Sequence, residues 1–272
     1  MSRPPPRPFD PARFAELQRA RGTPYGAPFH YSASTASTND LALDSARAGA
    51  SSGAVFLADH QTQGRGRRGK TWLAEPNHDL LFSILLRPER EATPPSLTLA
   101  VGLGVRAALA PASAEALTVK WPNDVLAGRR KLAGILCEGQ FEGKRLSALV
   151  IGIGVNIYQA PLPAELEGQV AALEQLGSVE TAREREFERE RLLVDILEAV
   201  ERRVTPCVRD GFASLLPEFA QHDALAGERV EVSGPTALVG RARGVDAEGR
   251  LLVESEGLVV PVYSGTVRVI GG

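Results

Sequence analysis

Residues 117–157, LTVKWPNDVLAGRRKLAGILCEGQFEGKRLSALVIGIGVNI, contain three apolar runs separated by tight turns. After LTVKW, the run DVLAGRRKLAGILCE (124–138) splits at Gly128 into the two strands of a hairpin. The last run, RLSALVIGIGVNI (145–157), is rich in β-branched residues, which favour strands. We therefore expect a mixed or antiparallel sheet at the centre of the fold, and not a doubly wound parallel one.

Apolar runs and periodic patterns on both sides of this centre predict the remaining elements of the main domain. A hydroxyl or Asn cap in STND (37–40) is expected to open an amphipathic helix. Other helices are indicated by apolar residues that recur at three and four positions. The expected strands are 28–32, 54–58 and 79–86, and the other expected helices are 10–21, 96–109, 181–204 and 208–219.

From about Gly227 the sequence changes to short alternating strands separated by tight turns that contain Gly. A unit of about 45 residues buries too little apolar surface to be stable alone, so we expect a small β-barrel docked on the main domain. The expected organisation has three parts. These are an N-terminal extension over 1–27, an α/β domain with a mixed sheet and flanking helices over 28–224, and the β-barrel over 225–272. The proline-rich start of the extension, 1–8, is expected to be disordered.

The composition is that of an ordinary globular protein, with 43% hydrophobic and 24% charged residues. A formal net charge of -2 argues against bulk attraction to nucleic acid or to an anionic membrane, so any anion site must be local. Neither a membrane span nor a signal peptide is visible, and the two cysteines, Cys137 and Cys207, are far apart. We expect a cytoplasmic protein that has no membrane partner.

The stretch QTQGRGRRGKTW (61–72) carries four positive charges threaded through three glycines. Glycines let backbone amides approach an anion, and arginines supply planar donors for a carboxylate or a phosphate. The spacing matches neither a Walker loop nor a dinucleotide fingerprint. Three interpretations stay open for the loop by itself: an anion site, a solvated basic surface loop, and an RNA-binding loop, although Trp72 alone lies near as a stacking platform.

Three further stretches place polar residues at the ends or starts of strands. KWPND (120–124) presents a Lys, an Asn and an Asp together, which suits a nucleotide and its metal ion but also an ordinary turn. KLAG (131–134) and GIGVN (152–156) interrupt apolar strands with glycines, and such glycines often mark the close approach of a ligand. Cys137 has no base beside it in the sequence and is interpreted as a core residue, not as a nucleophile.

Taken in order, STND, QTQGRGRRGKTW, KWPND, KLAGILCE and GIGVN, followed by a small β-barrel, strongly resemble the biotin protein ligases from about residue 30 onward. The resemblance implies a class II synthetase-like catalytic domain and an SH3-like barrel. It also implies that ATP, with Mg²⁺, activates biotin to biotinyl-5′-AMP. Biotin then passes to a lysine of a biotin carboxyl carrier domain. The few residues before the first expected strand favour the monofunctional type, which has no specific DNA partner.

The resemblance also assigns site residues by position. Arg67 and Lys131 are the expected catalytic residues, because both would bring positive charge to the reacting carboxylate and phosphate. Asp124 is the expected Mg²⁺ ligand. The implied biotin contacts are Ser37, Thr38, Asn39, Gln61, Gly64, Arg65, Gly66, Arg67, Lys131 and Gly134, and the implied ATP or adenylate contacts are Arg67, Trp72, Asn123, Asp124, Lys131, Gly154 and Asn156.

Two alternative functions are weighed against this one. A lipoate or octanoate ligase would share the catalytic fold, but its members generally lack the combination of GRGRRG and KWPND. A nucleic-acid-binding module would use the basic loop, against the overall acidity and the scarcity of aromatic residues. The sequence leaves open whether the protein is a monomer or a homodimer, which carrier protein it modifies, its affinities and rates, and whether the barrel contacts nucleotide or carrier.

Overall fold

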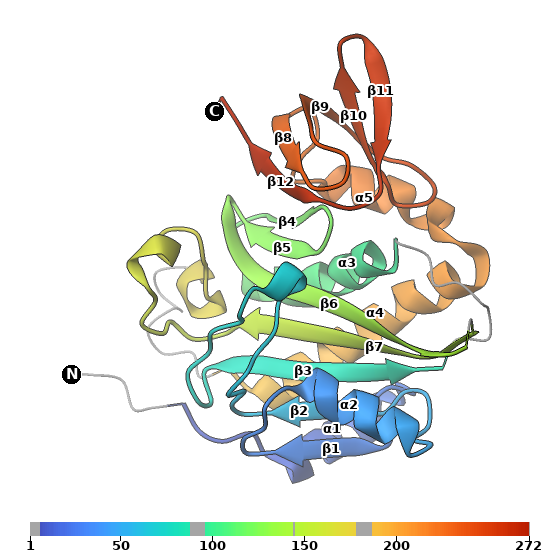
Figure 1. Ribbon diagram of the computed structural model, residues 1–272. Helices are drawn as coiled ribbons and strands as arrows, with labels where there is room; N and C mark the ends of the chain where they lie inside the picture. The colour runs from blue at the N-terminus through green and yellow to red at the C-terminus, as the bar shows by residue number, and fades with distance from the viewer. Residues whose placement is uncertain (1–5, 88–95, 144, 178–186, 272) are drawn as a thin grey trace.

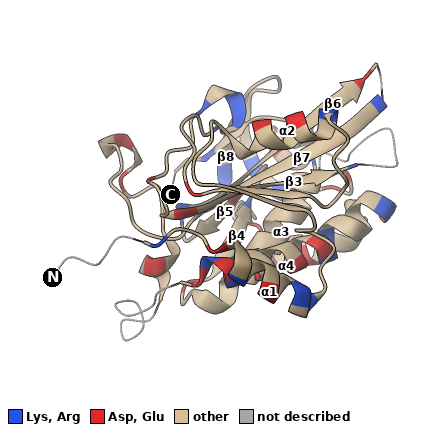
Figure 2. Ribbon diagram, turned by 90° about the horizontal axis from the view of Figure 1, so that it is seen from below, with Lys and Arg blue, Asp and Glu red and all other residues tan. Residues whose placement is uncertain are grey.

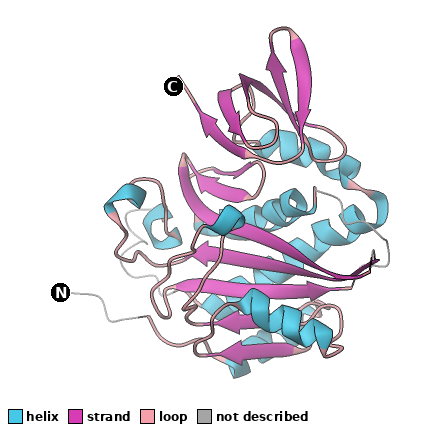
Figure 3. Ribbon diagram, viewed as in Figure 1, coloured by secondary structure: helices cyan, strands magenta, loops and turns pink. Residues whose placement is uncertain are grey.

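The computed structural model describes residues 6–87, 96–143, 145–177 and 187–271. Its centre is a seven-stranded sheet with the strand order β1-β2-β3-β7-β6-β5-β4, shown as arrows in Figure 3. The pair β1 and β2 is parallel and the other neighbours are antiparallel, so the predicted mixed sheet is confirmed. The strands are β1 (Phe29–Ser32), β2 (Val55–Ala58), β3 (Asp79–Leu86), β4 (Leu117–Lys120), β5 (Asp124–Ala127), β6 (Arg130–Glu142) and β7 (Arg145–Asn156).

Helices cover both faces of this sheet (Figure 1). On one face, α2 (Thr38–Arg47) packs on β2, β3 and β7. On the other face lie α3 (Leu97–Leu109) and α4 (Arg189–Asp210), and α1 (Pro11–Arg21) packs against α4. Alternate side chains of each strand face opposite sides, so Phe82 belongs to the large core under α3 and α4, whereas Leu85 belongs to the smaller core under α2.

One predicted helix boundary is wrong. The break expected between 204 and 208 does not exist, because α4 continues through Pro206 to Asp210. The apolar stripe that includes Val200 and Val204 continues to Cys207, which is fully buried, and this packing outweighs the cost of a proline near the helix end. The next helix is therefore shorter than predicted, α5 (Leu216–His222) after a 3₁₀ turn. The start predicted at 181 lies outside the described residues, but the prediction is also wrong at 187–188, because α4 begins at Arg189 and its N-cap, Glu188, is extended.

The C-terminal strands form a five-stranded antiparallel sheet in the order β11-β10-β9-β8-β12, as expected for the small SH3-like unit. This sheet shares a hydrophobic core with α3 and with Trp121, whose indole Nε1 donates to the Gly249 carbonyl over 3.0 Å. The predicted docking on the main domain is visible at the top of Figure 1. The strands are β8 (Arg229–Ser233), β9 (Leu238–Val245), β10 (Leu251–Ser255), β11 (Leu258–Val262) and β12 (Thr266–Val269).

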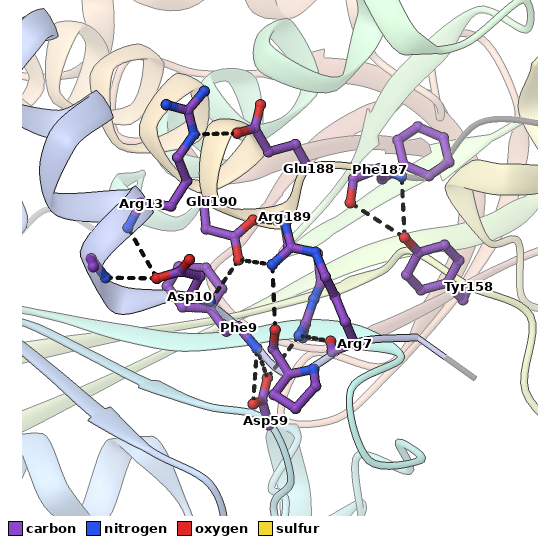
Figure 4. A network of polar contacts seen from close by, with 12 residues as sticks. Arg7, Phe9, Asp10, Arg13, Asp59, Tyr158, Phe187, Glu188, Arg189 and Glu190 are labelled. Atoms are coloured by element: carbon purple, nitrogen blue, oxygen red, sulfur yellow. Dashed lines mark hydrogen bonds and ion pairs between the residues drawn. The ribbon is translucent and has the colours of Figure 1, made fainter. Parts of the chain in front are cut away.

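Part of the N-terminal segment predicted to be disordered is held in place by a polar network (Figure 4). The Arg7 guanidinium bonds the Glu190 carboxylate at 2.9 and 2.8 Å, and Glu190 is fully buried. Next to it, buried Arg189 pairs with buried Asp59 at 2.9 Å, and the Asp59 carboxylate also accepts the Phe9 amide. The expected disorder is therefore wrong at Arg7, while residues 1–5 lie outside the described residues.

Charged residues of both signs lie close together on α1 and α4 (Figure 2). Arg21 on α1 pairs with Asp195 and Glu198 on α4, both at 2.9 Å. Arg13 pairs in the same way with Glu188 at 2.6 Å. These two cations are therefore matched by neighbouring carboxylates.

Candidate functional site

The basic loop is a closed hairpin that follows β2. The Trp72 amide donates to the Gly64 carbonyl over 2.9 Å, and the Gly66 amide donates to the Lys70 carbonyl over 2.6 Å. A Cβ at Gly64 would lie 2.6 Å from the Trp72 carbonyl oxygen, so the close approach of the two strands requires glycine there. Gly64 therefore closes the hairpin and lines neither of the cavities described below.

Two of the loop arginines are held by protein groups. Arg65 pairs with Asp40 at the start of α2 at 2.6 Å and with Glu138 on β6 at 2.9 Å. Arg68, in a left-handed conformation (φ 56°), donates over 3.2 Å to the carbonyl of Ser233 and over 3.2 Å to the hydroxyl of Thr266 in the C-terminal sheet. These contacts fasten the loop to the main domain and to the C-terminal unit.

Arg67 differs from both neighbours. Its guanidinium is half-buried and donates to the amide oxygen of Asn123 over 3.2 Å, and the described residues include no carboxylate in an ion pair with it. Burial, and then the adjacent charge of Arg68, lowers the pKa of Arg67 from its usual value. A cation that is partly removed from water and lies beside another cation is stabilised when an anion binds to it.

A polar pocket lies beneath the loop at the start of α2. The Gln61 side-chain oxygen accepts from the Thr38 amide over 2.7 Å and from its hydroxyl over 3.1 Å. Buried Ser83 on β3 lies 2.7 Å from the Thr38 hydroxyl and donates to the Asn39 amide oxygen over 2.6 Å. Ser37 is the N-cap, but its side chain makes no capping bond, so the predicted side-chain cap is wrong and Gln61 binds the first helical N–H instead.

A second cavity, about 570 Å³ in volume, lies on the other side of the loop, between the main domain and the C-terminal unit. Trp72 lies over the glycines of β6 and β7, where a Cβ at Gly134 or Gly154 would approach its ring to 2.8 or 2.7 Å. Lys131 Nζ lies 5.2 Å from the indole centroid and pairs with Asp124 at 2.7 Å. The glycines thus create a flat aromatic platform with a cation beside it.

Two asparagines at this cavity are already oriented by the backbone. The Asn123 side-chain amide donates to the Ile135 carbonyl over 2.8 Å while its oxygen accepts from Arg67, so Asn123 positions that guanidinium. The Asn156 amide donates over 3.2 Å to the carbonyls of both Lys131 and Ala171. Both donors of Asn156 are therefore used, which leaves its oxygen as the group able to accept from a ligand.

The two cavities share a wall. Every residue that the resemblance assigned, apart from Gly64, lines at least one of them. The first contains the polar residues of α2 and Gln61, and the second contains Asp124 and Asn156. The residues that line both are Gly66, Arg67, Trp72, Asn123 and Lys131.

Sequence reasoning missed several groups at this site. Ser83 is a lone polar residue in the apolar run DLLFSILL, and that signal was available. Glu138 and Asp40 bond the pocket residues, but nothing in the sequence distinguishes them from surface acids. Asp79, opposite Asn156 in the β3 and β7 pairing, lines a neighbouring cavity, and burial raises the pKa of its carboxyl to about 7.

Cys137 was predicted to be a core residue, and in the structure it is partly buried and packs against the edge of the large core. Burial raises the pKa of its thiol to about 12, so it stays protonated at neutral pH. Cys137 and Cys207 are both free. The Cys137 thiol is therefore unsuited to serve as a nucleophile.

Within the described ranges, no group of three His, Cys, Asp or Glu side chains is placed to hold a metal ion. Asp124 and Asn123 offer oxygen atoms of the type that Mg²⁺ accepts alongside substrate phosphates and water. The same described ranges contain no helix that is both long and apolar enough to cross a lipid bilayer.

Comparison with known proteins yields family and structural matches. The Biotin/lipoate A/B protein ligase family matches residues 31–156, and the Biotin protein ligase C terminal domain matches residues 226–269. Biotin--[acetyl-CoA-carboxylase] ligase of Mycobacterium tuberculosis is 35% identical over 243 residues, which cover 86% of each chain. Bifunctional ligase/repressor BirA of Bacillus subtilis is 30% identical over 86% of this chain and 71% of its own.

A solved structure is similar over nearly its whole length. Biotin protein ligase from Aquifex aeolicus in complex with biotin and ATP superimposes with a TM-score of 0.77 at 26% sequence identity. The match covers 89% of this chain and 98% of that one.

Proposed function

The chain belongs to the biotin protein ligase family, and we propose that it activates biotin with ATP to biotinyl-5′-AMP and transfers biotin to a lysine of a carboxylase carrier domain. One observation carries this function. A polar pocket and a nucleotide-sized cavity meet at a wall that contains Arg67 and Lys131. A reaction that joins a carboxylate to an α-phosphate needs two substrate sites that open on shared cations.

The polar pocket suits the ureido ring of biotin. Thr38, Asn39 and Gln61 supply hydroxyl and amide groups within one small space, and Ser83 supports them from the sheet. Lipoate offers a dithiolane ring with no hydrogen-bonding groups, so it would leave these polar atoms unpaired. Sites that hydrogen-bond a substrate reject analogues lacking those groups strongly, and the pocket therefore favours biotin over lipoate or octanoate.

In the nucleotide cavity, we assign adenine to the indole face of Trp72. The exocyclic amino group of adenine would donate to the side-chain oxygen of Asn156, because the side-chain donors of Asn156 are already occupied. Mg²⁺ would enter as part of the ATP complex, and we assign Asp124 as the carboxylate that would hold it. Gly265 and Thr266 line the same cavity, so the C-terminal unit forms part of the nucleotide site.

At the shared wall, Arg67 and Lys131 perform the charge chemistry. They hold the biotin carboxylate and the α-phosphate together, which would otherwise repel each other, and they neutralise the charge that develops as pyrophosphate leaves. Asn123 keeps the Arg67 guanidinium pointed at this place. The carrier lysine then attacks the acyl-phosphate and releases AMP, so the enzyme needs no nucleophile of its own.

The direct test is to incubate the full chain with biotin, ATP and Mg²⁺ and to follow biotinyl-AMP by mass spectrometry and pyrophosphate by a coupled assay. Product is expected with biotin, none after chelation of Mg²⁺, and little with lipoate in place of biotin. Pyrophosphate release with lipoate but not with biotin would overturn the substrate assignment.

We also propose that the chain binds no specific operator DNA and acts in the cytoplasm, where ATP and carboxylases are available. Arg13 and Arg21 of α1 pair with carboxylates, Arg13 with Glu188 and Arg21 with Asp195 and Glu198 of α4. Of the loop arginines, Arg65 and Arg68 contact protein groups and Arg67 is assigned to the adenylate, so within the described residues this loop offers no further arginine to DNA phosphates. A gel-shift assay with the biotinyl-AMP-loaded protein at physiological salt should show no sequence-specific complex, and a footprint on a palindrome would refute this.

A further inference from the structure

Glu138 on β6 bonds both the start of α2, which forms the floor of the biotin pocket, and the basic loop, which covers it. One of its oxygens, Oε2, accepts from the Asn39 side-chain amide over 2.5 Å and from the Arg65 guanidinium over 2.9 Å. Asn39 belongs to the floor of the pocket, at the start of α2, whereas Arg65 belongs to the stem of the loop that covers it. A single carboxylate atom therefore joins the floor to the cover.

We propose that Glu138 is a positioning residue for biotin, which couples the orientation of the Asn39 amide to the closed position of the basic loop. This inference rests on the proposed ligase function, because it assigns a new residue to the same site. Glu138 itself is not among the residues that line the pocket, so it acts through its two partners.

The effect on Asn39 follows from the amide's two ends. Its nitrogen donates to Glu138, and its oxygen accepts from Ser83 over 2.6 Å, so the two contacts allow one orientation of the side chain. The space is tight, because a Cβ at Gly152 would lie 2.3 Å from the Asn39 oxygen. In this orientation a second lone pair of the oxygen remains for a ureido N–H.

The effect on the loop follows from charge. Arg65 is shared between Asp40 on α2 and Glu138 on β6, so it ties the stem to two different elements. The hydrogen bonds to these two carboxylates raise the pKa of Arg65 in spite of its partial burial. Without these anions the loop would gather several unmatched positive charges, and the closed position would be disfavoured before a ligand arrives.

Three variants separate the two effects. Glu138→Ala removes the acceptor for Asn39 and the anion for Arg65. Glu138→Gln keeps an acceptor for Asn39 but loses the charge. Asp40→Asn weakens only the Arg65 side and serves as the matched control, because the Asp40 carboxylate bonds Arg65 whereas the Asn39 side-chain amide bonds Glu138.

The experiment measures the biotin Kd by calorimetry, the KM and kcat of adenylation, and the rate at which trypsin cuts the ligand-free loop after its basic residues. Glu138→Ala is expected to raise the biotin Kd and KM by about tenfold, with kcat at saturating biotin within about twofold of wild type. Glu138→Gln should give about a threefold rise, and Asp40→Asn less than that. Trypsin should cut the loop faster in all three.

Some outcomes would overturn the coupling. One is an unchanged biotin Kd in both Glu138 variants, and another is a Kd rise in Asp40→Asn as large as that in Glu138→Ala. If Glu138→Ala fails to fold, the comparison of Glu138→Gln with Asp40→Asn decides. Failure of wild type to bind biotin would instead refute the proposed function, and the trypsin measurement would still report the Arg65 contacts alone.

Discussion

Replacing Arg67 with Ala tests whether its guanidinium holds the adenylate. The side chain is half-buried, its neighbours in the loop are glycines and charges, and its guanidinium donates over 3.2 Å to the neutral Asn123 amide oxygen. Losing that bond should cost about 0.5–1.5 kcal/mol of folding stability. In the ligand complex the same guanidinium would bond an anion, a contact worth about 1.5–3 kcal/mol.

These magnitudes predict a small change in melting temperature and a loss of adenylate affinity of about 10- to 150-fold. The assay follows release of radiolabelled biotinyl-AMP from the protein by rapid filtration, beside a thermal melt. Released adenylate should acylate surface lysines of bystander proteins, which a streptavidin blot detects. Arg68→Ala is the matched control, since its guanidinium bonds neutral groups of the C-terminal sheet and should alter adenylate affinity by less than about tenfold.

The reasoning fails if Arg67→Ala retains the wild-type adenylate off-rate. It fails equally if the variant melts far below wild type while its adenylate affinity is intact, because Arg67 would then be a structural residue. An equal loss of affinity in Arg67→Ala and Arg68→Ala would show that general loop charge, and not the position of Arg67, retains the ligand.

Three other changes have defined outcomes. Gly154→Ala places a methyl 2.7 Å from the Trp72 ring, so the ATP KM should rise and the indole fluorescence should shift. An unchanged ATP KM would show that Trp72 does not belong to the nucleotide site. Lys131→Gln should lower adenylation kcat by at least about 100-fold, measured by pyrophosphate release, with little change in Tm because its ion pair with Asp124 is partly exposed. Burial raises the pKa of Asp79 to about 7, whereas the pKa of this carboxyl in the unfolded chain is about 3.9. The folded protein therefore loses this group's contribution to stability as the pH rises from about 4 through about 7. Asp79→Asn should flatten that decline in urea unfolding, and an unaltered pH slope would contradict the assignment.

The sequence by itself determined the central sheet and the C-terminal unit. The hairpin at Gly128 and the apolar run 79–86 appear where they were predicted, because strand alternation and turn chemistry are local properties. The family and the pocket-lining residues were also readable, since their motifs are contiguous stretches. The rule that a proline ends a helix failed at Pro206. The helix continues there because Cys207 packs into the core that is shared with the C-terminal sheet.

Only the tertiary structure decided which charges of the basic loop are free for a ligand. Arg65, Arg67 and Arg68 look equivalent in GRGRRG, yet one meets carboxylates, one meets the C-terminal sheet and one faces the shared wall. Their partners lie tens to nearly two hundred residues away in the chain, and Glu138 likewise gains its role by adjacency to α2. Contacts at such separations depend on the packing of whole elements, which local patterns of charge and hydrophobicity do not encode.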